Sequence, residues 1–184
     1  MIMKFNKPIA LLLAVIMAML LSFPSRKSIG LGLTADAAEI TPKEPTLTTN
    51  KYDIDNNGGN DEVYEISTRE ELYWFAYKVN NENATYGSAN AVLTANITVN
   101  TGDVAGCEGT PGVDWVSWTP IGNYENSYTG TFDGRNHTIS GLYFNDEGTE
   151  YGGLFGYMES GGSVSNVGVI NSYINGGGYV GGVC

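Results

Sequence analysis

The chain has 184 residues, with 20 acidic and 9 basic side chains and a net charge of −11 at pH 7. This negative charge repels phosphate backbones and provides no basic patch for anionic lipid, which argues against nucleic-acid binding and against membrane association beyond a leader. One histidine and two cysteines are too few for a zinc site of several imidazoles or for a disulfide-rich framework.

The first 37 residues have the pattern of a secretory signal peptide. A short basic start, MIMKFNK, precedes the apolar run Pro8–Phe23, and residues 35–37 (Ala-Asp-Ala) fit a small-x-small cleavage site. Arg26 and Lys27 lie between the run and this site, so an uncleaved membrane anchor is an alternative. Cleavage after Ala37 would leave 5 basic and 19 acidic residues, a net charge of −14.

Residues 38–60 are predicted to be an acidic, polar linker. The segment AEITPKEPTLTTNKYDIDNNGGN has two prolines and almost no apolar periodicity. A weak candidate for a calcium loop overlaps its end, because the expected spacing is matched by Asp53, Asp55, Asn57, Gly58 and Asp61. The last ligand position holds Tyr64 instead of an acid, and no helix precedes the loop, so a solvated linker is favoured.

Ordered structure is predicted to begin near Asp61, with a short strand VYEI and then a helix over residues 68–80. Ser67 with Glu70, or Thr68 with Glu71, can form a capping box at the start of this helix. Apolar residues follow at helical spacing on one face, namely Leu72, Phe75, Ala76 and Val79. This is the one segment after the leader for which the sequence predicts a helix.

Downstream the pattern indicates strands and turns. NAVLTANITVN alternates, which predicts a half-buried strand with an inward row of Leu93, Ala95, Ile97 and Val99. An irregular loop over 100–114 follows. From Trp118 onward the chain repeats short apolar runs bounded by glycine.

Two internal similarities suggest that these runs are repeats. YGGLFG at 151–156 aligns with YVGGVC at 179–184, an offset of 28, and ISGLYF at 139–144 aligns with VSNVGV at 164–169, an offset of 25. Such periods without intervening helices predict an all-β solenoid whose stacked coils bury one another's apolar rows. A bend at Gly141 would turn both Ile139 and Leu142 inward. The competing architecture is an antiparallel sandwich with a hairpin at Asp133-Gly134.

Residues 63–184 resemble bacterial surface proteins with GLUG-type repeats. The motif W-x-P-I-G, then F-D-G-x-x-H-T-I-S-G-L and G-L-F-G, is matched by the structural repeat residues Trp118, Pro120, Ile121, Gly122, Phe132, Asp133, Gly134, His137, Thr138, Ile139, Gly141, Leu142, Gly153, Leu154, Phe155 and Gly156. Tyr128 replaces a frequent Phe, and Arg135-Asn136 stands where a glycine is common. The resemblance implies a right-handed parallel β-helix, with residues 68–80 as an N-terminal cap, on a secreted or wall-attached protein, often Gram-positive. It assigns no catalytic residues.

The cluster Asp133, Arg135 and His137 could suggest a general base oriented by an acid, but no nucleophile or metal site accompanies it. The favoured interpretation is structural: Asp-Gly makes a turn with Gly134 at positive φ, and His137 begins a half-exposed strand.

Tryptophans precede the first repeat and could stack on sugars. Trp115 and Trp118, with Tyr124 or Tyr128, would form such a platform, but packing is the favoured role. Cys184 lies in an apolar glycine pattern, where it would serve as a small hydrophobic residue, and a bridge to Cys107 is the alternative.

The sequence therefore predicts a non-catalytic scaffold or adhesin-like stalk without cofactors, secreted or attached to the cell surface. Its partner would be an extracellular ligand, with a host protein or a glycan as examples, and further repeats are expected after Cys184. The alternatives are the N-terminal accessory region of a secreted peptidase or polysaccharide-degrading enzyme, and a carbohydrate-binding module.

Overall fold

The computed structural model describes residues 39–55 and 57–184. The predicted signal peptide and its cleavage site lie outside the described residues. Within the described part, no helix is both long enough and apolar enough to span a membrane.

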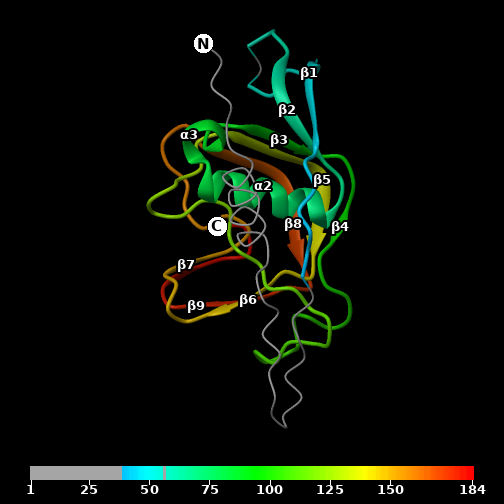
Figure 1. Ribbon diagram of the computed structural model, residues 1–184, viewed down its shortest axis with the longest axis vertical. Helices are drawn as coiled ribbons and strands as arrows, with labels where there is room; N and C mark the ends of the chain where they lie inside the picture. Colours follow the sequence, from blue (N-terminus) through cyan, green and yellow to red (C-terminus); the bar gives the residue numbers. More distant parts are fainter. Residues whose placement is uncertain (1–38, 56) are drawn as a thin grey trace, which may run out of the picture. The chain divides into compact units, whose positions relative to one another are not determined.

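Strands dominate the described part of the chain, which confirms the predicted all-β class (Figure 1). Its elements, in chain order, are β1 (Thr46–Tyr52), β2 (Asp61–Ile66), α2 (Arg69–Asn81), α3 (Asn83–Tyr86), β3 (Asn90–Leu93), β4 (Ile97–Thr98), β5 (Thr131–Ser140), β6 (Tyr143–Asp146), β7 (Tyr151–Gly152), β8 (Ser163–Ile170), β9 (Tyr173–Gly176) and β10 (Tyr179–Val180).

Strand β1 corrects the linker prediction for residues 46–52. It pairs antiparallel with β2, placing Leu47 opposite Tyr64 and Thr48 opposite Val63. Most of β1 is exposed, so it lacks the alternation of apolar residues from which a strand is predicted. Its three threonines are β-branched and suit a pleated, exposed edge. Regular structure in the described part of the chain therefore begins at Thr46, before the onset near Asp61 that the sequence predicts.

Every pairing other than β1–β2 within the described residues is parallel. The ladder runs β2-β3-β5-β8, so each strand pairs with one from the next stretch of chain. We call these stretches segment 1 (61–89), segment 2 (90–130), segment 3 (131–162) and segment 4 (163–184). In Figure 1, β3, β5 and β8 run side by side near α2, and β6, β7 and β9 form a second group below them.

The register confirms one predicted repeat offset and corrects the other. Tyr151 pairs with Tyr179, 28 residues later, as predicted. Ile139 pairs with Val169, which is 30 residues later and not 25. The offset falls from 32 to 30 within β5, because the bend has three residues at 134–136 in β5 but only Asn166 in β8. The sandwich alternative is wrong, since Asp133-Gly134 lies inside β5 and not in a hairpin.

Helix α2 forms at the predicted place and packs on segments 2 and 3. The Thr68 hydroxyl accepts a hydrogen bond from Glu71 N, and the Glu71 carboxylate accepts one from Thr68 N, which completes the predicted capping box. Leu72, Phe75, Ala76 and Val79 are all buried. The Phe75 ring contacts the rings of Tyr128 and Phe132 at centroid distances of 6.0 and 6.3 Å. The helix therefore covers apolar side chains of segments 2 and 3.

The predicted strand over 90–99 is two short strands, β3 and β4, separated by a corner at 94–96. The inward row is confirmed for Leu93, Ile97 and Val99, which are buried, while Ala95 at the corner is half-buried. The side chain of Asn96 in this corner accepts a hydrogen bond from Thr138 N of segment 3 at 3.0 Å. The corner is thus joined to the segment stacked on it.

Candidate functional site

The bend at Asp133–His137 is held by side-chain contacts with segments 2 and 4. Asp133 Oδ1 accepts hydrogen bonds from Arg135 N and from Asn166 Nδ2, both at 2.9 Å. The half-buried ring of His137 contacts Asn96 Oδ1 through Nδ1 at 3.2 Å, so its neighbour is an amide and not a carboxylate. The guanidinium of Arg135 lies 5.1 Å from the ring centroid of Tyr52. These contacts therefore do not bring an acid, a base and a nucleophile together.

One detail of the bend differs from the prediction. The positive φ angles belong to Arg135 (49°) and Asn136 (63°), and not to Gly134. A Cβ added at Gly134 would lie 2.5 Å from the backbone oxygen of Asn166. Glycine stands at this position because segment 4 approaches closely, and not because the turn needs a left-handed conformation.

The acidic loop between β1 and β2 brings three carboxylates together. One oxygen from each of Asp53, Asp55 and Asp61 lies within 4.8 Å of the others. Backbone N–H groups of the loop already bind them: Asp53 accepts from Asn57 N and Gly58 N, and Asp61 accepts from Ile54 N. The Asn57 oxygen accepts a bond from Gly59 N instead of pointing at the carboxylates. The loop hydrogen bonds account for this convergence, and the calcium interpretation gains no further support.

The residues of the repeat motif serve packing. Its large apolar members are all buried, and they are Trp118, Ile121, Phe132, Ile139, Leu142, Leu154 and Phe155. Its glycines lie where segments approach closely: a Cβ at Gly122 would lie 2.4 Å from Tyr157 O, and one at Gly141 would lie 2.1 Å from Asn100 O. Gly141 has φ +80°, and both Ile139 and Leu142 beside it are fully buried, which confirms the predicted bend.

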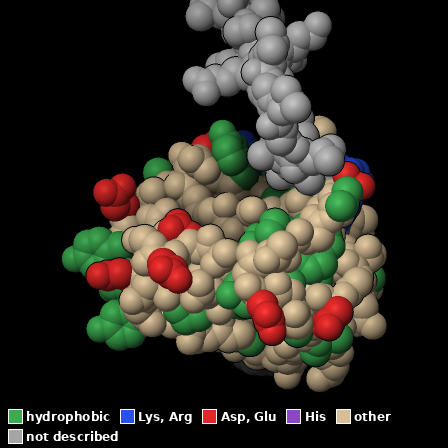
Figure 2. All heavy atoms as spheres, turned by 90° about the horizontal axis from the view of Figure 1, so that it is seen from below, with side chains coloured by type: hydrophobic (Ala, Val, Ile, Leu, Met, Phe, Trp, Pro, Cys, Tyr) green, Lys and Arg blue, Asp and Glu red, His purple; other side chains and the backbone are tan. Residues whose placement is uncertain are grey.

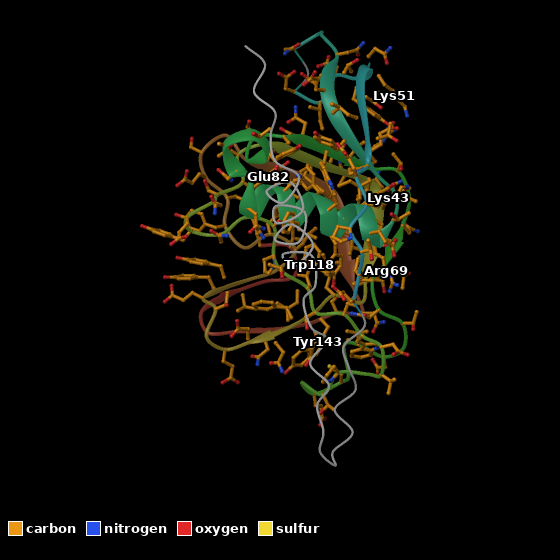
Figure 3. All side chains as sticks on the ribbon, viewed as in Figure 1. Lys43, Lys51, Arg69, Glu82, Trp118 and Tyr143 are labelled. Atoms are coloured by element: carbon orange, nitrogen blue, oxygen red, sulfur yellow. The ribbon has the colours of Figure 1, made fainter. Side chains whose placement is uncertain are left out.

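Trp118 and Tyr128 pack inside the fold, so they cannot form a sugar platform. Trp118 is 2% exposed, donates from Nε1 to Gly153 O at 2.9 Å and meets the Tyr73 ring edge-on at 5.2 Å. The Tyr128 side chain is fully buried, and burial raises the pKa of its hydroxyl, which donates to Ala89 O. Figure 3 shows Trp118 below α2, and Tyr143 at the start of β6.

A groove of about 430 Å³ opens beside Trp118. It forms because residues 117–122 of segment 2 run directly from the β6 side to the β7 side, with Trp118 N donating to Tyr143 O and Ile121 N to Leu154 O. Segment 3 instead takes a longer path between Tyr143 and Leu154, through the turn at 147–150. Aromatic rings and polar side chains line the groove together, among them Ser117, Trp118, Thr119, Asn123, Phe144, Asp146 and Tyr151.

A row of four tyrosines adjoins this groove. Ring centroids are 5.6 Å apart for Tyr124–Tyr157, 5.2 Å for Tyr157–Tyr151 and 5.5 Å for Tyr151–Tyr179. Tyr124 is 72% exposed and Tyr179 is 74% exposed, so the two ends of the row face solvent. Tyr151 belongs both to the row and to the groove wall. We refer to these four residues as the tyrosine row.

The sequence singled out Tyr124 only as a partner of the tryptophans, and it did not find the row. The four residues are separated by 6 to 55 positions, and the parallel stacking of segments 2, 3 and 4 brings them together. The repeat offset of 28, which aligns Tyr151 with Tyr179, was the available signal.

The acidic residue of the groove remains charged. The Thr149 hydroxyl donates to Asp146 Oδ2 at 2.7 Å and Gly148 N donates to Oδ1 at 2.9 Å, and these bonds lower the pKa of Asp146. None of the described residues lining the groove is lysine or arginine. Figure 2 shows acidic side chains scattered over the face seen from below, with basic ones only near its edge.

Asn100 is a second residue that the sequence did not reveal. It is buried, and its amide donates to Val116 O and Gly141 O while its oxygen accepts from Val116 N. These bonds join segment 2 to the bend of segment 3. Cys107 and Cys184 are free thiols, and Cys184 is exposed, so it does not serve as the small hydrophobic residue that the sequence pattern predicts.

No family model and no solved structure was found to match the chain. The chain is similar to halomucin of Haloquadratum walsbyi, with 32% identity over 126 residues. The match covers 68% of this chain and 1% of halomucin. It is therefore a similarity to one short stretch of a very long protein.

Proposed function

We propose that this chain is a non-catalytic scaffold module, a right-handed parallel β-helix with GLUG-type repeats, from a secreted or cell-surface protein. The observation that carries the proposal is the parallel ladder β2-β3-β5-β8, in which strands from successive segments lie in register. Parallel strands joined by whole circuits of chain allow each segment to bury its apolar row on its neighbours.

The use of the polar residues supports a scaffold over an enzyme. The sole histidine contacts an amide, and the clustered acids of the β1–β2 loop bind backbone N–H groups. The motif residues fill the interior or permit close backbone approach. Similarity to a short stretch of halomucin suits a module that is used within a longer chain. An adhesin-like role and a Gram-positive host remain predictions from the sequence resemblance.

Export can be tested with the 184-residue chain expressed with its own leader in a Gram-positive secretion host. The expected product is a processed protein outside the cytoplasm, with Ala38 as its first residue by N-terminal sequencing. A matched variant with Leu12→Arg and Leu13→Arg interrupts the apolar run and should remain inside the cell unprocessed. Cytoplasmic retention of the unaltered chain, with its leader intact, would contradict the proposal.

A further inference from the structure

We infer that the groove beside Trp118 and the tyrosine row together bind a neutral polysaccharide. This inference goes beyond the scaffold proposal and does not depend on it, because it rests on the side chains at one surface.

The tyrosine row supplies faces on which sugar rings can stack. Tyrosine combines an apolar ring with a hydroxyl and loses little conformational entropy when it is immobilised, so it suits ligands that are partly apolar and partly polar. The ends of the row, Tyr124 and Tyr179, are 72% and 74% exposed and contribute little to the core. Contacts between neighbouring rings hold the row in place before a ligand arrives.

The groove supplies hydrogen-bonding groups next to those rings. Ser117, Thr119 and Asn123 are exposed on its wall, and Asn123 immediately precedes Tyr124 of the row. The hydroxyls of Ser117 and Thr119 can donate and accept, as sugar hydroxyls do, whereas the Asn123 oxygen already accepts from Glu125 N and Asn126 N and its amide nitrogen is left to donate. The Asp146 carboxylate is fixed by Thr149 and Gly148, and each of its oxygens retains capacity to accept from a ligand hydroxyl.

The charge of this surface selects among polysaccharides. Asp146 lines the groove, Glu150 adjoins Tyr151, and the described lining residues include no basic side chain. A uronate or sulfate chain would therefore meet repulsion with no compensating cation. A neutral chain avoids this repulsion, since its hydroxyls can donate to the carboxylate.

The length of the tyrosine row favours a chain over a single sugar. The row continues from Tyr124 on segment 2, through Tyr157 and Tyr151 on segment 3, to Tyr179 on segment 4. A ligand that contacts several of these rings must extend across three segments. Contacts with Tyr124 at one end and with the stacked pair Tyr151–Tyr179 at the other then combine in one molecule.

The test is affinity electrophoresis of the 184-residue chain through gels that contain hydroxyethylcellulose, galactomannan or xyloglucan, with polygalacturonate as the anionic comparison. We expect retardation by at least one neutral polysaccharide and none by polygalacturonate. Tyr151→Ala and Tyr124→Ala should each weaken binding about two- to tenfold, the range expected for one lost aromatic contact. The matched control, Tyr52→Ala, removes a tyrosine of the β1–β2 hairpin and should leave binding unchanged.

Tyr124→Ala keeps the test valid if Tyr151→Ala lowers the melting temperature, because Tyr124 is largely exposed. Three results would overturn the inference: no retardation in any neutral gel, equal weakening by Tyr52→Ala and Tyr124→Ala, or tighter binding to polygalacturonate. Failure of export would leave these binding results unaffected, so the two proposals fail separately.

Discussion

Replacing Gly141 by alanine should destabilise the fold strongly, for two reasons that add. The residue has φ +80°, which costs an alanine about 1–2 kcal/mol. The added Cβ would also lie 2.1 Å from Asn100 O, which is backbone and can yield only if segments 2 and 3 separate. Overpacking of this kind typically costs about 1–3 kcal/mol. The expected loss is therefore about 2–5 kcal/mol, a large part of the stability of an ordinary domain.

Urea denaturation at pH 7, followed by circular dichroism, would measure this loss, with two glycine controls that separate the causes. Gly58 also has positive φ, but a Cβ there meets nothing within 4 Å, so Gly58→Ala should show only the strain of about 1–2 kcal/mol. Gly182 has neither feature, and Gly182→Ala should change stability by less than about 0.5 kcal/mol. A Gly141→Ala variant no less stable than Gly58→Ala would refute the close approach of segments 2 and 3.

Three further predictions concern polar side chains. Asn100→Ala should lower the free energy of unfolding by about 1–3 kcal/mol in the same assay, because it leaves the backbone groups of Val116 unpaired; no change would contradict the buried amide network. Burial opposes ionisation of Glu71, but hydrogen bonds from Ser67 and Lys43 outweigh it and lower its pKa. The ionised Glu71 carboxylate therefore stabilises the fold above the ordinary carboxyl pKa, and this stabilisation is lost as the pH falls through the pKa of the folded state. When the free energy of unfolding is measured between pH 5 and about pH 3, it should decrease less with falling pH in Glu71→Gln than in the unaltered chain. His137→Ala should change stability by less than about 1 kcal/mol, because the ring makes one contact, with Asn96; a larger loss would contradict this small contribution. Ile139→Asp should unfold the chain, because it buries a charge.

Local signals were sufficient for part of this fold. The helix was placed within one residue at each end, because capping residues and apolar spacing lie within a few positions of one another. The bend at Gly141 also followed from local spacing, since Ile139 and Leu142 could both be buried only if the chain turned between them.

Features that depend on distant partners were not predictable in the same way. Strand β1 is defined by pairing with β2 and not by its own pattern, so the sequence of residues 46–52 predicts a linker. The offset of 25 comes from aligning similar residue types, whereas the pairing register of the strands depends on the number of residues in each bend. Gly134 is required by the backbone of Asn166, 32 positions later. The tyrosine row likewise depends on which segments stack together.

The most direct test of the parallel stacking is a disulfide between positions 145 and 175. Asn145 pairs with Asn175 in β6–β9, and adjacent strands lie about 4.7–4.9 Å apart, within the range that a disulfide spans. In a background with Cys107→Ser and Cys184→Ser, Asn145→Cys with Asn175→Cys should form an intramolecular disulfide, identified by mass spectrometry of peptides. Asn145→Cys with Ile174→Cys places the second thiol on the opposite face of β9 and should not. Absence of the 145–175 disulfide, or equal formation with position 174, would contradict the parallel register.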